Sequence, residues 1–455
     1  MPAGRSLPED PSLENLRKQA KRLQKAVRAG EVEPLAQLGE FHPRAEAAVA
    51  RFTLSEAQLV IARSYGFASW PKLKQYLEVV ERFLWDPPAG TPPEGRTEPL
   101  ADTFVRGLLD RDPSLANRKG GPLAWAPLLH ACYSRLDSPH PEHSTLEVAR
   151  LLIARGADPN AGFLWRGLVP PFTAITGAFG EGEDGKNQGP HRQCEELVRL
   201  LLEAGADPND GQALYNRHFR SDDGHLKLLL AYGLGRDKGG PWYERLGERM
   251  QSPARLLVEE LCSGARKGFV DRVTLLVEQG VDVNTPGLRD GRTPYEAALR
   301  AGHHEIAAYV LEHGARKVEL DVKDAFAAAC VGGRRAEARA FLEKEPNLLD
   351  QLGRHGRIEL LHRAVEGDRL EGLSLMAELG FETSGMTVHD GVGMNLNATP
   401  MHNAAWKGNL EMVKLLVELG ADPGLREPSY NGTPLDWAAH NQQDHVVEYL
   451  RSLAG

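Results

Sequence analysis

Cysteine is scarce in this chain, and its few thiols are scattered. The four are Cys132, Cys194, Cys262 and Cys330, and none of them forms a C-x-x-C pair. A disulfide framework or a structural zinc site needs several cysteines at short spacings. The pattern argues against both classes and fits a protein of the reducing cytosol, so we expect a cytoplasmic location.

Long apolar runs are missing as well. No window approaches the roughly 18 uninterrupted apolar residues from which a membrane-spanning helix is recognised. The opening segment, MPAGRSLPEDPSLENL, has no apolar core of the kind found in secretory signal peptides. We therefore expect no signal peptide, no transmembrane helix and no association with membranes.

The charge balance does not favour polyanionic partners. The net charge is −9, although residues 1–85 hold 13 Lys/Arg against 10 Asp/Glu, which is +3 for that segment and −12 for the remainder. A molecule with this balance is not drawn as a whole to nucleic acid or to anionic membranes. We do not expect nucleic-acid binding, and the basic first segment remains the alternative place for it.

Catalytic and cofactor signatures are also absent. The sequence contains no G-x-S-x-G, P-loop, kinase or H-E-x-x-H motif. Only Gly180–Lys186 (GEGEDGK) matches G-x-G-x-x-G, and it follows an expected helix instead of a strand. Its three acids would repel a pyrophosphate, so we interpret it as a solvated loop. We expect no cofactor and no metal, and we interpret the histidines as structural or solvated.

What the chain does contain is a recurring phrase. Leu151–Asn160 reads LLIARGADPN, and close variants occupy Leu201–Asn209, Leu275–Asn284 and Leu415–Pro423. The leucines suit the buried side of a helix, and glycine suits its end because glycine tolerates a left-handed backbone. Asp-Pro then turns the chain outward. Each copy therefore predicts a helix followed by a projecting loop.

A second phrase falls between these copies. Thr-Pro, followed by a pair of small residues, begins at Thr293, Thr399 and Thr433. Proline suits the first turn of a helix, and threonine before it can accept from free N–H groups. These two phrases, recurring about every 33 residues, resemble the ankyrin repeat. The resemblance implies an all-α ankyrin-repeat solenoid, built from helix–turn–helix units with β-hairpin or loop fingers, in which stacking buries the apolar faces.

The organisation along the chain follows from these patterns. Residues 1–85 predict a small helical leader, because apolar side chains recur from Leu13 to Val27 at helical spacing and Thr53–Glu56 forms a capping box. This leader resembles one found ahead of ankyrin arrays in bacterial proteins. Residues 86–99 are a Pro/Gly-rich linker. Residues 100–455 predict an array of about nine units, the first of them degenerate.

The resemblance to ankyrin repeats implies where a partner binds. Variable positions of the first helix of each unit line the concave face, and Trp, Tyr and Arg, which dominate binding hot spots, occur there. We expect Trp406 and Trp437, in adjacent repeats, to be neighbours. The alternative is that either Trp packs against the next unit. The predicted contact residues are Tyr133, Arg266, Lys267, Arg300, Arg363, Asn403, Trp406, Lys407, Trp437 and His440.

Two fingers add apolar side chains to this surface. The finger after Asn160 carries Phe163 and Trp165 where polar residues are usual. The finger between Gly380 and Thr399 is longer than the others. Exposed apolar clusters and adaptable methionines tend to mark contacts. In the longer finger the predicted contact residues are Met386, His389 and Met394.

Together these features predict a noncatalytic scaffold in a bacterial cytoplasm, monomeric, that binds a protein or peptide through its concave face and fingers. Three alternatives stay open. One is an enzyme or enzyme accessory with a pocket in the irregular region 160–260. Another is a nucleic-acid binder that works through the basic leader. The third is an effector secreted into a host cell, because one repeat scaffold serves many partners.

Overall fold

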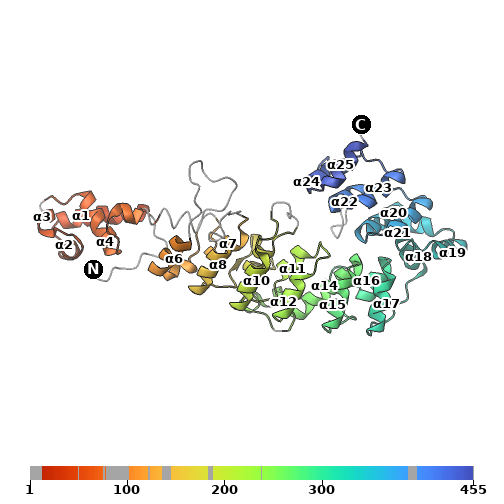
Figure 1. Cartoon of the computed structure of the whole chain (residues 1–455), viewed down its shortest axis with the longest axis horizontal. Helices are drawn as coiled ribbons and strands as arrows, with labels where there is room; N and C mark the ends of the chain where they lie inside the picture. Colours follow the sequence, from red (N-terminus) through yellow and green to blue (C-terminus); the bar gives the residue numbers. More distant parts are fainter. Residues whose placement is uncertain are drawn as a thin grey trace. The chain divides into compact units, whose positions relative to one another are not determined.

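The computed structural model describes residues 13–49, 51–74, 77, 102–120, 123–135, 145–182, 188–236, 238–387 and 397–453 (Figure 1). The predicted linker 86–99 lies outside these ranges. The chain divides into two compact units. Unit 1 comprises residues 1–180 and 190–206, and unit 2 comprises residues 181–189 and 207–455. Within the described ranges, no helix combines the length and the apolar character needed to cross a bilayer.

Unit 1 begins with the helices of the leader. The predicted apolar stripe is buried at Leu16, Ala20, Leu23 and Val27, and the capping box at Thr53–Glu56 forms as expected. The helices of the leader are α1 (Leu13–Arg28), α2 (Val32–Phe41), α3 (Ala45–Val49) and α4 (Leu54–Ser64).

The rest of unit 1 consists of helix pairs and one hairpin. Gly162–Phe163 pairs antiparallel with Phe172–Thr173, so the finger after Asn160 is a two-stranded hairpin. The elements are α6 (Asp102–Arg111), η1 (Pro113–Ala116), α7 (Pro127–Tyr133), α8 (Thr145–Ala154), β1 (Gly162–Phe163), η3 (Trp165–Gly167), β2 (Phe172–Thr173), α9 (Ala174–Phe179) and α10 (Cys194–Glu203).

Unit 2 is a longer run of helix pairs in which an inner helix alternates with an outer one. Its elements are α11 (Gly211–Arg217), α12 (Gly224–Ala231), α13 (Pro241–Leu246), η4 (Gly247–Arg249), α14 (Pro253–Lys267), α15 (Val270–Glu278), α16 (Pro294–Arg300), α17 (His304–Glu312), α18 (Val322–Val331), α19 (Arg335–Lys344), α20 (Leu348–Glu366), α21 (Leu370–Glu378), α22 (Pro400–Lys407), α23 (Leu410–Glu418), α24 (Pro434–His440) and α25 (Asp444–Ser452).

The Thr-Pro phrases start inner helices, as predicted. The hydroxyls of Thr293, Thr399 and Thr433 each accept from the backbone N–H three residues on. At Thr399 the cap is reciprocal, because its backbone N–H donates to His402 Nδ1 at 3.2 Å. His402 Nε2 lies 3.0 Å from the carbonyl oxygen of Gly432 in the next finger. One side chain thus fixes both a helix start and the neighbouring repeat.

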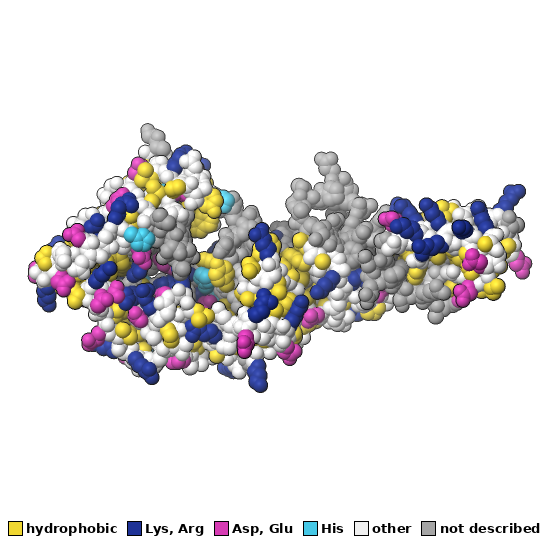
Figure 2. Space-filling view, turned by 180° about the vertical axis from the view of Figure 1, so that it is seen from behind, with side chains coloured by type: hydrophobic (Ala, Val, Ile, Leu, Met, Phe, Trp, Pro, Cys, Tyr) yellow, Lys and Arg dark blue, Asp and Glu magenta, His cyan; other side chains and the backbone are white. Residues whose placement is uncertain are grey.

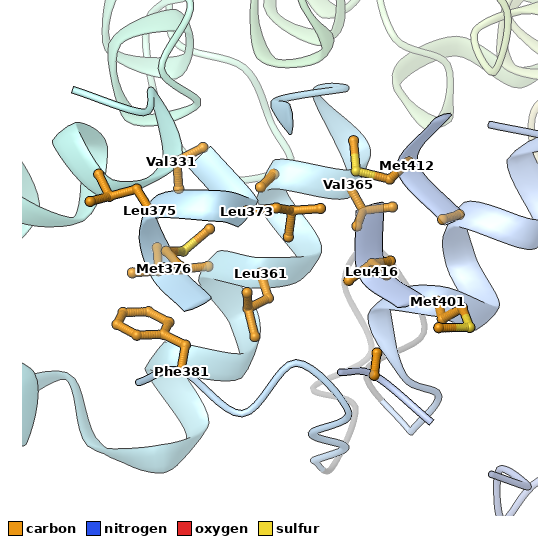
Figure 3. Packing of buried hydrophobic residues seen from close by; sticks show 14 of the residues in the cluster. Val331, Leu361, Val365, Leu373, Leu375, Met376, Phe381, Met401, Met412 and Leu416 are labelled. Carbon is orange, nitrogen blue, oxygen red and sulfur yellow. The ribbon is translucent and has the colours of Figure 1, made fainter. Parts of the chain in front are cut away.

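The core of unit 2 runs continuously between the layers of helices. Figure 3 shows side chains from successive repeats interdigitating, with Leu361 and Leu373 beside Met376 and Phe381, and Val365 beside Leu416. All of these are buried. Removing one such leucine costs about 2–5 kcal/mol of unfolding free energy, because its cavity cannot fully collapse.

The array of unit 2 turns back on itself near α18 and α19 (Figure 1). Glycines allow this tight approach. A Cβ on Gly372 would lie 2.1 Å from the carbonyl oxygen of Val331, and one on Gly302 would lie 2.5 Å from the Cα of Gly332. Only a residue without a side chain fits such spacings. The C-terminal ends of α14 and α20 lie close together, with Arg266 Nε 3.9 Å from a Glu366 carboxylate oxygen.

A charged network is buried before this bend. Arg272 on α15 is completely buried, and its guanidinium pairs with Asp223 at 2.6 Å and with Glu260 at 3.1 Å. A third nitrogen donates to the Arg220 carbonyl oxygen at 2.7 Å. Burial raises the pKa of the Glu260 carboxyl to about 7, although Arg272 opposes the shift. The repeated phrases give no sign of this network.

Candidate functional site

The inner helices near the end of unit 2 carry a cluster of rings. The indole centroids of Trp406 and Trp437 lie 5.8 Å apart at an interplanar angle of 74°, and His440 stacks on Trp406 at 5.7 Å. The prediction that the two tryptophans are neighbours is confirmed. Both indoles are half-buried and His440 is exposed, so part of each ring is open to solvent.

Trp437 also has a structural task. It packs edge-on against His402 at 5.3 Å, and its indole donates to the buried carboxylate of Glu427. Burial alone would raise the pKa of Glu427. Hydrogen bonds from backbone N–H groups and from Trp437 outweigh this effect, so the pKa is lowered. Trp437 thus holds its own finger in place, whereas the Trp406 ring packs against the rings of Trp437 and His440.

The same finger presents an aromatic residue that the repeat pattern did not single out. Tyr430 is 81% exposed, and its backbone N–H donates to Glu427 Oε1 at 2.9 Å. Glu427 also accepts from the N–H groups of Ser429 and Gly432. A fixed loop that carries an exposed ring has the chemistry of an interface anchor.

Two predicted contact residues make their hydrogen bonds mainly within the array. Asn403 is only 7% exposed, and its amide nitrogen lies 2.9 Å from His362 Nδ1. The prediction that Asn403 is available to a partner is therefore wrong, because neighbouring helices enclose it. Lys407 is more exposed, but its ammonium donates to the carbonyl oxygens of Val365 and Glu366 and to Asp368. It satisfies the end of α20.

Two predicted cations of the inner face form ion pairs. Arg300 pairs with Glu296 at 3.0 Å and with Asp324 at 2.6 Å. Arg363 pairs with Glu359 at 2.5 Å. Figure 2 shows Lys and Arg side chains mixed with acidic ones around the hollow of unit 2. These arginines are held in fixed positions, and part of their hydrogen-bonding capacity is already used.

Arg266 and Lys267 differ from these arginines. Within the described residues, Lys267 has no carboxylate oxygen within 4.0 Å, and its ammonium donates to the His218 carbonyl oxygen at 2.8 Å. Burial, with help from Arg266, lowers the pKa of Lys267 to about 7, against the opposing effect of Glu366. The Nε atom of Arg266 is buried without a hydrogen-bond acceptor. Both side chains are therefore incompletely neutralised.

In unit 1 the predicted contact residues form an aromatic cluster. Phe163 stacks on Phe172 at 5.5 Å across the hairpin and on Trp125 at 4.8 Å. Tyr133 lies 5.0 Å from the Trp125 ring. Trp165, 53% exposed, packs its remaining surface near Phe172. The cluster fixes the hairpin and leaves Trp165 as its most open ring.

The longer finger is described only in part. Met386 is half-buried, and its carbonyl oxygen accepts from Arg354 at 3.0 Å. His389 and Met394 lie outside the described residues.

The GEGEDGK string differs from the expected solvated loop over its described start. It follows helix α9, as expected, but the Glu181 side chain is only 7% exposed and pairs with Arg217 at 2.7 Å and Arg220 at 3.0 Å. The expectation of full solvation is wrong at this residue, because two arginines attract its carboxylate into the structure.

Several buried titratable groups have pKa values far from neutrality. Burial lowers the pKa of His362 to about 3 and that of His303 to about 4. It raises the pKa of the Cys262 and Cys330 thiols to about 12. Protonated thiols are weak nucleophiles. Across the described residues, no group of three His, Cys, Asp or Glu side chains is placed to hold a metal ion.

The leader has a groove of its own. It has a volume of about 660 Å³ and is lined by Val27, Arg28, Gly30, Leu35, Val49, Arg51, Phe52 and Thr53. The lining combines apolar side chains with two arginines and contains no acid or nucleophilic thiol. Arg28 Nε is already bonded to the Phe52 carbonyl oxygen at 3.0 Å. The groove lies outside region 160–260, where the enzyme alternative placed a pocket.

Comparison with known proteins bears on the repeats directly. The family model for ankyrin repeats, in three copies, matches residues 361–454. The described part of the chain is predominantly helical. The chain therefore carries ankyrin repeats, and its fold is an all-α repeat solenoid, as the two recurring phrases predicted.

Several curated proteins are similar over part of the chain. Alpha-latrotoxin-Lg1a of Latrodectus geometricus is 29% identical, over 43% of this chain and 14% of its own length. Palmitoyltransferase AKR1 of Lachancea kluyveri is 30% identical, over 33% of this chain and 20% of its own length. Phosphocholine transferase AnkX of Legionella pneumophila is 24% identical, over 47% of this chain and 22% of its own length. The chain thus covers less than a quarter of each relative.

Proposed function

We propose that the chain is a noncatalytic scaffold that binds another protein or peptide through the inner face of its repeats and the adjoining fingers. The observation that carries the proposal is the cluster of Trp406, Trp437 and His440, which spans two adjacent inner helices and remains partly open. Such rings bury a large apolar area at a small cost in side-chain entropy. Exposed Tyr430 extends the same chemistry onto a finger.

The state of the ionisable groups supports a noncatalytic role. General acid–base catalysis needs a group that titrates near the working pH and can reach a substrate. On the inner face Arg300 and Arg363 are paired with carboxylates, and burial moves the pKa of His362 to about 3 and that of Cys262 to about 12. Two groups have a pKa of about 7, but Glu260 is buried against Arg272 and Lys267 donates to the His218 carbonyl oxygen. The activities named for the similar proteins belong to chains that this one covers only in small part.

The proposal also includes the setting in which the scaffold works. We place it as a monomer in a bacterial cytoplasm. Isolated cysteines with raised pKa values suit a reducing compartment, and the leader resembles that of bacterial ankyrin-repeat proteins.

Affinity capture from a lysate of the source organism tests the proposal. The wild-type chain is compared with a Trp406→Ala/Tyr430→Ala double variant. Tyr309→Ala, which removes a ring from outer helix α17, is the matched control. We expect a protein that wild type and control retain and that the double variant loses, after circular dichroism shows that all three are folded. The loss should be confirmed by titration with the purified partner.

Two results would count against the proposal. Equal retention of every captured protein by the double variant would remove the ring cluster from the binding surface. Chemical conversion of the captured protein by the wild-type chain, seen as a mass change, would replace the scaffold with an enzyme.

A further inference from the structure

The bend of unit 2 concentrates cations at one place. Arg266 and Lys267 end helix α14, and Arg289 lies in the finger that follows α15. That finger is tied to α14, because the backbone N–H of Leu288 donates to the Glu259 carboxylate at 2.9 Å. Arg289 acts electrostatically on Arg266 and on His218, so the three cations share one neighbourhood.

These cations are only partly paired within the protein. Among the described side chains, neither Lys267 nor Arg289 has a carboxylate oxygen within the 4.0 Å of an ion pair, and Arg266 reaches Glu366 only at 3.9 Å. Nearby Asp290 is engaged by Arg292 at 3.5 Å. Like charges held together with few anions in ion-pair range repel one another, and a bound anion relieves that repulsion and favours the charged form of Lys267.

An exposed aromatic surface adjoins the cations. Tyr215 and Phe219, at the end of α11, are 41% and 48% exposed, and their rings lie 5.6 Å apart. His218 lies between them in sequence and 4.1 Å from the Phe219 ring. The Lys267 ammonium lies 5.2 Å from the centre of the Phe219 ring. Positive charge and open rings therefore meet on one surface.

We propose that Arg266, Lys267 and Arg289, together with Tyr215 and Phe219, form a docking site for an acidic peptide segment of the partner that carries an aromatic or aliphatic side chain. Its carboxylates pair with the cations, and its apolar side chain packs on the Phe219 and Tyr215 rings. The inference rests on the proposed function, since it assigns the chemistry of the partner to one part of the same inner face.

The surroundings favour a short acidic peptide over nucleic acid. Glu366, Asp290 and Glu296 are interleaved with the arginines at this end of the inner face. They would repel a continuous phosphate backbone, which needs an unbroken basic track. A peptide can place one or two carboxylates among the cations and keep its apolar side chain over the rings.

Selection from a phage-displayed library of random dodecapeptides on the full-length chain tests the inference. We expect enrichment of peptides rich in Asp or Glu that contain an aromatic or aliphatic residue. Enriched sequences are then synthesised with a fluorescent label, and their affinity is measured by anisotropy. Lys267→Met/Arg289→Ala should weaken binding at least about tenfold, because two charge-assisted contacts are lost. Lys317→Met/Arg451→Ala removes two exposed cations elsewhere in unit 2 and should have no effect.

The possible outcomes separate this inference from the proposed function. Enriched peptides that are not acidic, or that bind the Lys267/Arg289 variant as tightly as wild type, would overturn the acidic site. If the binding of those peptides still depends on Trp406, the proposed scaffold function would be retained. Failure to enrich any peptide over an empty support would count against both. Tighter binding of a labelled oligothymidylate than of the peptides, lost in the same variant, would assign the site to nucleic acid.

Discussion

Arg266 and Glu366 lie three inner helices apart, yet the guanidinium Nε and a carboxylate oxygen are separated by 3.9 Å. A straight stack would keep them well apart, because neighbouring helices pack about 8–10 Å from axis to axis. The pair meets because the array turns back on itself near α18 and α19 (Figure 1). In the same region Gly372 approaches Val331 and Gly302 approaches Gly332. Because of the bend, residues of α14 and α20 lie on one shared surface, although these helices belong to different repeats.

The close approach at Gly372 gives a first prediction. Gly372→Ala would place a methyl group 2.1 Å from the Val331 carbonyl oxygen, so the repeats must separate. We expect a loss of about 1–3 kcal/mol in the free energy of unfolding, measured by urea denaturation. Gly356→Ala in helix α20 is the matched control, since its Cβ would meet Leu352 at an ordinary 3.7 Å. A Gly372→Ala variant as stable as this control would show that the close approach to Val331 does not constrain the packing of these repeats.

The buried network gives a second prediction. Arg272→Met leaves the carboxylates of Asp223 and Glu260 buried without their cation, which costs about 3–5 kcal/mol of stability at neutral pH. The loss should be smaller in mild acid, where Glu260 protonates readily because burial has raised its pKa to about 7. Arg339→Met, at an exposed position, should stay within about 0.5 kcal/mol of wild type. Chemical denaturation at two pH values provides the measurement, and a loss independent of pH would contradict the assignment.

Lys267 gives a third prediction, which concerns pH. Its folded pKa of about 7 lies below the ordinary lysine value of 10.5 because burial disfavours the ammonium, with contributions from Arg266 and Arg272 that Glu366 and Glu260 oppose. Between pH 7 and 10.5 the unfolded chain therefore binds more protons at this residue, so folding stability rises with pH. Lys267→Met lacks this rise.

The stability gap between Lys267→Met and wild type is the quantity to measure. We expect the free energy of unfolding of the variant to exceed that of wild type by the largest amount at or below pH 7. This difference should shrink as pH approaches 10.5. Most other titrating groups are common to both chains and cancel in the difference, except Glu260, whose pKa Lys267 itself lowers. A gap that stays constant from pH 7 to 10 would mean that the fold does not lower the pKa of Lys267. A stabilised variant with weakened peptide binding would mark Lys267 as a residue kept for function.

Local sequence predicted the local structure well. The Thr-Pro phrases start helices because the threonine hydroxyl and the preset proline backbone act within one turn. The neighbouring positions of Trp406 and Trp437 followed from the repeat period alone. The prediction for Asn403 was wrong because a helix position does not reveal what the next repeat presses against it, here His362. The contact roles assigned to the remaining residues stay predictions.

The sequence by itself determined that this chain is a stack of capped helix pairs, because caps, apolar periodicity and turn glycines act over a few residues. Only the tertiary structure decided where the stack bends, that Arg272 is buried among carboxylates, and that Arg266, Lys267 and Arg289 gather beside Phe219. These depend on contacts between residues tens of positions apart. Curvature arises from small rotations between repeats and from a few backbone approaches, and no local pattern encodes their sum.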